Sequence, residues 1–160
     1  MTGVTSYEVR VSVNGEETVL AVDVRTLLTD FIRVNLGLTG THVACEHGVC
    51  GACTVLVDDQ PVRACLMLAV QVDGCRLETV ESLGTADSLS LSQESLRARH
   101  GLQCGFCTPG ILMTVEGALR SGSSAEDTLN DGLSGHLCRC TGYQNIRAAI
   151  EAYYAEVSRG

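Results

Sequence analysis

Apolar and polar residues alternate along the start of the chain. Tyr7, Val9, Val11 and Val13 share one face of an extended segment, and the residues between them are polar or charged. The turn dipeptide Asn14-Gly15 follows, and residues 18–22 form the returning strand. This pattern predicts a β-hairpin over residues 7–22.

The spacing of apolar residues then becomes helical. Leu27, Leu28, Phe31 and Ile32 recur at the spacing of one helix face, with Asp23 as the cap before them and Gly37 as the stop after them. A loop rich in Gly and Cys runs from Gly40 to Cys53, and residues 58–61 form a turn. Short strands are predicted at Thr54–Val57, Val62–Leu66 and Arg76–Val80. One helix over a mixed sheet makes this region an α+β unit.

After Glu81 the pattern changes to helices joined by short polar connections. Ser82–Ser90 is a polar link, and helices are predicted over residues 92–100, 109–120, 123–133 and 143–157. Gly101 is the expected stop of the first of these helices, and Ser123 with Glu126 forms a capping box for the third. We therefore expect two domains, residues 1–81 and residues 82–160, the second a small four-helix bundle.

The chain has nine cysteines, and the first four follow a recognisable spacing. Four residues separate Cys45 from Cys50, two separate Cys50 from Cys53, and eleven separate Cys53 from Cys65. The first two spacings match the plant-type [2Fe–2S] ferredoxin loop. Small residues in such a loop let backbone N–H groups approach the sulfurs, and Cys65 is expected on a neighbouring strand.

A second set consists of two close pairs, Cys104 with Cys107 and Cys138 with Cys140. Each pair is followed by a threonine, Thr108 or Thr141, which we expect to cap a helix, with Pro109 at the first position of its helix. Two helix N-termini would then face one anionic cluster. The sequence predicts two [2Fe–2S] clusters on eight cysteines, and Cys75 is left as an ordinary half-buried thiol.

Other uses of these cysteines fit the spacing less well. A tetrahedral zinc site is a poor match to the close spacing of these ligands, and a disulfide framework needs an oxidising compartment. A Rieske centre fails because Cys45-Glu46-His47 has no Cys-x2-His partner.

The four histidines are isolated and are read as loop or surface residues: His42, His47, His100 and His136. The chain has no G-x-G-x-x-G fingerprint, nucleophile elbow or paired-carboxylate arrangement, so we expect it to carry electrons without substrate chemistry of its own.

Charge narrows the class of partner. The formal net charge is −8, with eleven arginines, no lysine and no basic run, which argues against nucleic acid or an anionic membrane surface as partner. No apolar run reaches the length of a membrane span, and the N-terminus has no export signal. We therefore expect a cytoplasmic protein that docks on other proteins.

Three motifs together resemble the iron–sulfur subunit of the molybdenum hydroxylases, the family of xanthine dehydrogenase and aerobic carbon monoxide dehydrogenase. The resemblance extends from about Tyr7 to Tyr153 and is carried by residues 45–53 (CEHGVCGAC), 103–110 (QCGFCTPG) and 137–143 (LCRCTGY). It implies a plant-ferredoxin-like β-grasp domain followed by a four-helix domain.

The resemblance also implies partners and an order of electron flow. A molybdopterin-binding large subunit and an FAD-binding medium subunit would complete a heterotrimer or a dimer of heterotrimers. The cluster on Cys104, Cys107, Cys138 and Cys140 would lie nearer the molybdenum cofactor, and the cluster on Cys45, Cys50, Cys53 and Cys65 nearer the flavin. Gln103 and Cys140 match positions close to the pterin in the family.

Family substrates are N-heteroaromatics, aldehydes, purines and carbon monoxide. The alternative is a free-standing two-cluster ferredoxin, which would purify without partners.

Overall fold

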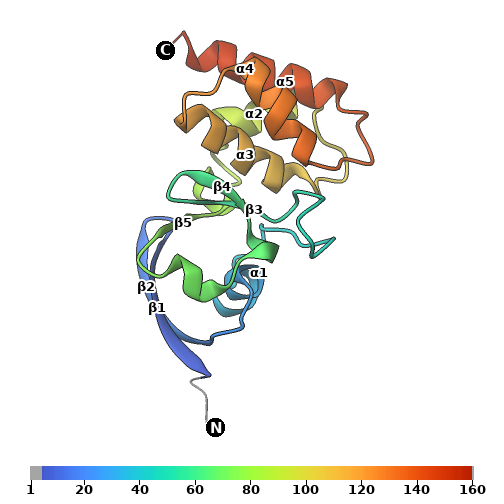
Figure 1. Cartoon of the computed structure of the whole chain (residues 1–160). Coiled ribbons are helices and arrows are strands. Elements are labelled where there is room, and N and C mark those ends of the chain that lie inside the picture. The colour runs from blue at the N-terminus through green and yellow to red at the C-terminus, as the bar shows by residue number, and fades with distance from the viewer. Residues whose placement is uncertain (1–4, 160) are drawn as a thin grey trace.

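The computed structural model describes residues 5–159. Met1–Val4, which carry part of the prediction that no export signal is present, lie outside this range, as does Gly160. The first half of the described chain builds a sheet with a short helix across it, and the second half builds helices that lie above the sheet in Figure 1. Each half has its own cluster of buried apolar residues.

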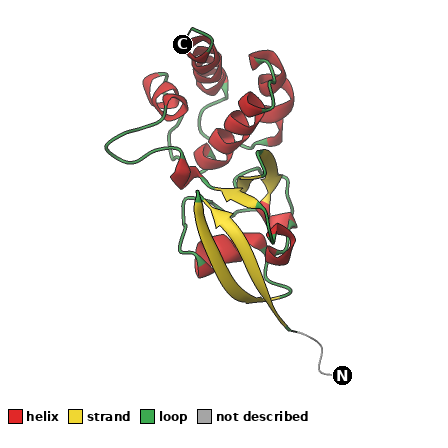
Figure 2. Cartoon of the chain, turned by 90° about the vertical axis from the view of Figure 1, so that its left-hand side faces the viewer, coloured by secondary structure: helices red, strands yellow, loops and turns green. Residues whose placement is uncertain are grey.

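The sheet has five strands in the order β2-β1-β5-β3-β4 (Figure 2). Their bounds are β1 Ser6–Val13, β2 Glu16–Asp23, β3 Thr54–Val57, β4 Gln60–Arg63 and β5 Arg76–Glu78. Only β1 and β5 pair in parallel, and the other pairs are antiparallel. The predicted hairpin and mixed sheet are confirmed, and the hairpin turns at Asn14 and Gly15, whose φ angles are +50° and +88°.

The predicted first helix is a short segment, α1 (Leu28–Asp30), continued by a π-helical turn at Phe31–Asn35. Phe31 and Ile32 are fully buried in the same core as strand residues such as Val9, Val55 and Leu77. This packing joins the helical segment to the sheet in one apolar core. The segment ends before Gly37, whose φ of +72° fits the predicted stop.

Two details around the second hairpin differ from the prediction. Its turn consists of Asp58 and Asp59 alone, both with positive φ, so Gln60 and Pro61 already belong to β4. Cys65 lies in a 3-10 turn, Ala64–Leu66, and not on a strand. The Ala64 N–H still bonds the carbonyl of Cys53 at 3.2 Å, in register with the β3–β4 pairs, and the chain turns beyond it, where the Met67 N–H bonds the carbonyl of Ala64 at 3.3 Å.

The second half contains three longer helices and one irregular helical segment: α2 (Leu91–Ala98), α3 (Thr108–Arg120), α5 (Gln144–Val157) and α4 (Ala125–Asp127). A π-helical turn at Thr128–Gly132 and a 3-10 turn at Leu133–Gly135 continue α4. Apolar side chains from these elements form the second core, among them Leu96, Ile111, Leu112, Leu129, Ile146 and Ile150. No helix in the described part of the chain is long and apolar enough to span a membrane.

The predicted helix caps at the second cysteine set are wrong. Thr108 is the first residue of α3, and the cap position belongs to Cys107. Thr141 lies two residues before Tyr143, the residue at the start of α5. Both threonines are one or two positions away from the cap because the cysteine-containing loops continue up to the helices.

Two further helix ends are displaced by one residue. The capping box of α4 pairs Ser124 with Asp127, one position after the predicted pair, and the Ser124 hydroxyl accepts the Asp127 N–H at 3.1 Å. The left-handed residue that ends α2 is His100, with φ +54°, although Gly101 was the expected stop. Gly101 donates its N–H to the carbonyl of Leu96 at 2.8 Å, which completes the helix end one residue later.

The two halves are joined at the surface by Arg120, the last residue of α3. Its guanidinium donates to Glu78 at 2.8 and 2.9 Å and to Asp59 at 2.7 Å, so it crosses from the helices to the sheet. Glu78 raises the pKa of Arg120, and Arg120 with Arg76 lowers the pKa of Asp59. This forked contact is a charge-assisted connection between the two halves.

Replacing Arg120 with methionine is expected to lower the free energy of unfolding by about 1 kcal/mol, because water screens part of this interaction. The loss should shrink in concentrated salt, and urea unfolding at two salt concentrations measures it. Arg10→Met is the matched control, since Arg10 pairs with Glu8 within strand β1 and both side chains are exposed. Equal stability of the Arg120→Met and Arg10→Met variants would show that the Arg120 contacts contribute nothing.

Candidate iron–sulfur centres

The structure brings the four thiols of the first set together. Cys45 and Cys50 lie in the loop before β3, and the Cys50 N–H points at the Cys45 sulfur at 3.4 Å. Cys65 and Cys50 are both close enough to Cys53 to influence the pKa of its thiol. Cys53 and Cys65 are buried, whereas Cys45 and Cys50 are partly exposed.

Two different environments surround these sulfurs. The backbone N–H of Cys50, followed by that of His47, lowers the pKa of the Cys45 thiol to about 6. Burial raises the pKa of Cys53 to about 11. The loop therefore offers N–H donors on its outer side and apolar surroundings on its inner side, the combination that stabilises anionic sulfur while excluding water.

The thiols of the second set also meet. The sulfurs of Cys104 and Cys140 are 3.5 Å apart, although the two residues are 36 positions apart in sequence. Cys107, at the start of α3, is close enough to Cys138 for that thiol to influence its pKa. Cys104 and Cys140 are exposed, Cys138 is partly buried and Cys107 is buried, so one edge of this set faces outward.

Backbone and hydroxyl donors approach this second set as well. The N–H of Phe106 lowers the pKa of Cys104, and burial raises the pKa of Cys107 to about 12. Burial also acts to raise the pKa of Cys138, but hydrogen bonds, first of all from Thr141, outweigh it and the pKa is lowered. The Thr141 hydroxyl lies 3.1 Å from the Cys138 sulfur, so a donor is in place for a thiolate there.

Both sets suit a two-iron cluster better than a single metal ion. In a [2Fe–2S] cluster each iron takes two protein thiolates, whereas a structural zinc ion takes four ligands round one point. Within residues 5–159, no three His, Cys, Asp or Glu side chains surround a common point closely enough to hold one ion. The thiols approach one another in pairs instead: the sulfurs of Cys104 and Cys140 are 3.5 Å apart, and Cys65 is close enough to Cys53 to influence its pKa.

Two other residues named from the sequence have defined places. The Gln103 side-chain amide donates to the carbonyl of Cys140 at 3.1 Å, and both residues are exposed. Cys75 is a partly buried thiol just before β5, outside both sets. Burial raises the pKa of Cys75, in agreement with the half-buried thiol predicted for this position.

Two histidines have contacts that sequence reasoning missed. His42, from the sheet half, stacks on Phe106 in the second cysteine loop, with ring centroids 4.8 Å apart, and its Nδ1 lies 2.8 Å from the Phe106 carbonyl. His136 is only 1% exposed, and burial, followed by Arg63, lowers its pKa to about 3, so it is neutral. His42 and Phe106 are 64 positions apart, and the Nε2 of His136 reaches the hydroxyl of Thr114, 22 positions away, so no local pattern encodes these contacts.

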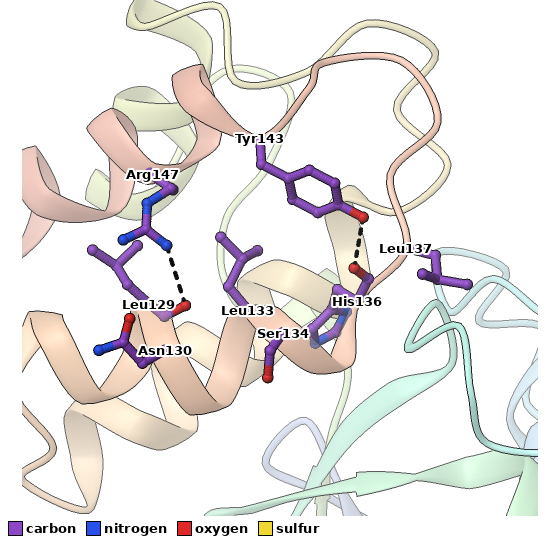
Figure 3. A pocket seen from close by; sticks show the side chains of 8 residues that line it. All are labelled: Leu129, Asn130, Leu133, Ser134, His136, Leu137, Tyr143 and Arg147. Atoms are coloured by element: carbon purple, nitrogen blue, oxygen red, sulfur yellow. Dashed lines mark hydrogen bonds between the residues drawn. The ribbon is translucent and has the colours of Figure 1, made fainter.

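Tyr143 is part of the third motif, but its role could not be read from the sequence. Figure 3 shows it at a cavity of about 320 Å³, with its hydroxyl directed at the backbone of His136. The hydroxyl donates to the His136 carbonyl at 3.0 Å and accepts the N–H of Cys138 at 2.8 Å. A tyrosine thus supports the backbone beside a candidate ligand.

The chain matches two family models that together cover most of its length. Residues 11–78 match the 2Fe-2S iron-sulfur cluster binding domain, and residues 79–151 match the [2Fe-2S] binding domain. Each match contains one complete set of four cysteines.

Named relatives are similar over nearly the whole chain. The chain is 51% identical over 152 residues to the caffeine dehydrogenase subunit gamma of Pseudomonas sp. strain CBB1, covering 92% of this chain and 91% of the relative. It is 49% identical over 144 residues to the nicotine 6-hydroxylase small subunit of Paenarthrobacter nicotinovorans, covering 89% and 87%.

A solved structure gives the same result for the fold. A chain of quinoline 2-oxidoreductase from Pseudomonas putida 86 superimposes with a TM-score of 0.89 at 44% identity, covering 98% of both chains. Sequence motifs, paired thiols, family models and fold agree, and the chain belongs to the [2Fe–2S] electron-transfer subunits of the molybdenum hydroxylases.

Proposed function

We propose that this chain relays electrons from a molybdopterin-binding large subunit to an FAD-binding medium subunit of one complex. The observation that carries the proposal is the presence of two separate four-thiol sets, one of which presents Cys104 and Cys140 at the surface. An exposed edge permits close approach by a partner's cofactor. We expect substrate chemistry to take place on a partner subunit.

We assign one cluster to each set of thiols. The ligands are Cys45, Cys50, Cys53 and Cys65 for the first cluster, and Cys104, Cys107, Cys138 and Cys140 for the second. When bound, a [2Fe–2S] cluster accepts and releases one electron. The chain's own residues hold the sulfurs, direct N–H groups at Cys45 and Cys104, and bury Cys53 and Cys107 away from water.

The proposed order of electron flow depends on which cysteine set each partner subunit covers. We propose that the molybdopterin subunit docks at Gln103 and Cys140, where the bond from the Gln103 amide to the Cys140 carbonyl holds the backbone of an exposed ligand. The FAD subunit would cover the first cysteine loop, where Val49 and Leu66 are 57% and 62% exposed. Exposed apolar side chains of this kind suit a protein interface.

The complex is proposed to hydroxylate an N-heteroaromatic compound. Three relatives carry the names of such compounds, caffeine (itself a purine), nicotine and quinoline, which supports this class, purines included, over aldehydes and carbon monoxide. The choice of substrate would rest with the molybdenum subunit.

We propose a heterotrimer, or a dimer of heterotrimers, located in the cytoplasm. The two separate cores support a boundary near residue 81, between a β-grasp domain at residues 1–81 and a helical domain at residues 82–160. We propose a four-helix arrangement for the second domain, with α4 and its continuation to Gly135 as the irregular fourth member.

Electron paramagnetic resonance of the dithionite-reduced, natively purified complex tests this function. We expect two distinguishable signals and about four iron atoms per copy of this chain. The large and medium subunits should remain bound through purification. One signal, or a sample containing zinc, would show that a cysteine set is wrongly assigned. Two signals from a chain that purifies alone would favour the free-standing ferredoxin.

A further inference from the structure

A three-residue segment, His136–Cys138, connects the two candidate cluster sites; we call it the bridge segment. At one end it contains Cys138, a member of the second set. At its centre the N–H of Leu137 donates to the carbonyl of Cys50, a member of the first set, at 2.9 Å. A path of covalent bonds interrupted by one hydrogen bond therefore joins a thiol of each set.

Tyr143 holds the bridge segment on both sides of that hydrogen bond. Its hydroxyl accepts the Cys138 N–H at 2.8 Å and donates to the His136 carbonyl at 3.0 Å, the second of which is drawn in Figure 3. One phenol thus satisfies the backbone groups on either side of Leu137. The Leu137 N–H is left directed at Cys50.

The backbone of Tyr143 indicates that its position is enforced. Its φ is +68°, a left-handed conformation that costs a bulky residue free energy and persists only where the surroundings impose it. The Tyr143 N–H bonds the Thr141 hydroxyl at 3.1 Å, and that hydroxyl in turn lies against the Cys138 sulfur. The strained residue is therefore tied to the ligand loop through its backbone as well as its side chain.

His136 fixes the bridge segment from the opposite side. Its Nε2 lies 2.7 Å from the Thr114 hydroxyl of α3, and its ring packs so closely on Gly51 of the first loop that a side chain at Gly51 would collide with it. Arg63 also donates to the carbonyl of Gly135, 2.8 Å away, just before the segment. The segment has little freedom to move away from Cys50.

We propose that Tyr143 is a positioning residue for electron exchange between the two clusters, acting by holding the bridge segment so that the Leu137–Cys50 hydrogen bond stays formed. In this exchange one electron leaves the cluster on Cys138, which is oxidised, and reaches the cluster on Cys50, which is reduced; no proton moves and no covalent bond breaks. Electronic coupling falls steeply across a through-space gap, and the hydrogen bond replaces such a gap. The proposal rests on the proposed function for the ligand roles of Cys50 and Cys138.

The test uses Tyr143→Phe in the purified complex, with iron counted. We expect full iron content, a weaker magnetic interaction between the two reduced clusters, and a several-fold slower electron equilibration between them after flash reduction. Tyr153→Phe is the matched control, because it removes a hydroxyl that bonds Glu116 at 3.1 Å elsewhere in the same half of the chain. The control should leave both measurements unchanged.

A second pair of variants tests the hydrogen bond itself. Leu137→Pro removes the N–H, and His136, at φ −122° and ψ 133°, already has the backbone that precedes a proline. Leu137→Ala keeps the N–H and loses only a side chain that is 59% exposed. We expect the proline variant to show a weaker magnetic interaction and slower electron equilibration. The alanine variant should match the parent in both measurements.

The outcomes separate this inference from the proposed function. A Leu137→Pro variant with full iron, an unchanged magnetic interaction and an unchanged rate of electron equilibration would refute the role of the bridge segment, whatever the result for Tyr143→Phe. If Leu137→Pro weakens the magnetic interaction and slows electron equilibration but Tyr143→Phe changes neither, only the role of Tyr143 would be overturned. If Tyr143→Phe does not fold, the Leu137 pair decides. A parent complex without two cluster signals would instead refute the ligand assignment on which the function rests.

Discussion

Replacing Cys140 with serine is expected to disrupt the second cluster and to leave the first intact. Cys140 is exposed and its sulfur lies 3.5 Å from that of Cys104, so its loss removes one ligand from the outward edge of the set. Iron should fall from about four to about two atoms per chain, and one of the two paramagnetic signals should disappear. The signal assigned to Cys45, Cys50, Cys53 and Cys65 should keep its shape, because these thiols lie in the other half of the chain, which has its own apolar core.

Cys75→Ser is the matched control for this experiment. Cys75 is a thiol outside both sets, so its replacement should preserve both signals and all of the iron. Loss of both signals in Cys140→Ser would show that the two halves do not fold independently. Loss of iron in Cys75→Ser would mean that the sets of ligands are wrongly chosen.

The second large effect is expected at Gly110, where α3 touches the first cysteine loop. A Cβ at this position would overlap the carbonyl oxygen of Gly51, and that contact is backbone against backbone. Alanine normally stabilises a helix by up to about 1 kcal/mol over glycine, but here the loop and the helix must separate. We expect Gly110→Ala to lower the free energy of unfolding by about 3 kcal/mol, measured by urea unfolding of the purified chain.

Gly117→Ala in the same helix gives the comparison. Its Cβ would meet side-chain atoms of Leu56 and Pro61 at 2.8 and 3.0 Å, and the Leu56 methyl group has more freedom to shift than a peptide carbonyl. Gly117→Ala should therefore lower the free energy of unfolding by less than Gly110→Ala does. A Gly110→Ala variant as stable as the parent would show that the loop is not held against the helix as described.

Elements whose signals are local could be predicted from the sequence. The hairpin follows from alternation and from Asn14-Gly15, and α5 was placed within one residue because Ile146, Ala149 and Ile150 mark its buried face. The grouping of the cysteines into two sets came from spacing alone. In the structure, each set lies together as spacing and motif predicted.

Features that depend on contacts between distant segments could not be predicted. Val62–Leu66 reads as a strand that would contain Cys65, but beyond Ala64 the Met67 N–H bonds the Ala64 carbonyl and the chain turns. Thr108 and Thr141 resemble caps locally, yet the cysteine loops determine where α3 and α5 begin. His136 has no apolar pattern around it, and its burial arises only when Gly51 and α3 close over it.

The contact between Gly51 and Gly110 has a consequence for the energetics of electron transfer. No side chain separates the first cysteine loop from the helix, so the loop cannot shift without moving α3. A change in charge at such a loop is met by dipoles that are already in place, with little movement of atoms. The reorganisation energy on the protein side is therefore kept small, and two glycines help to set how fast an electron can arrive and leave.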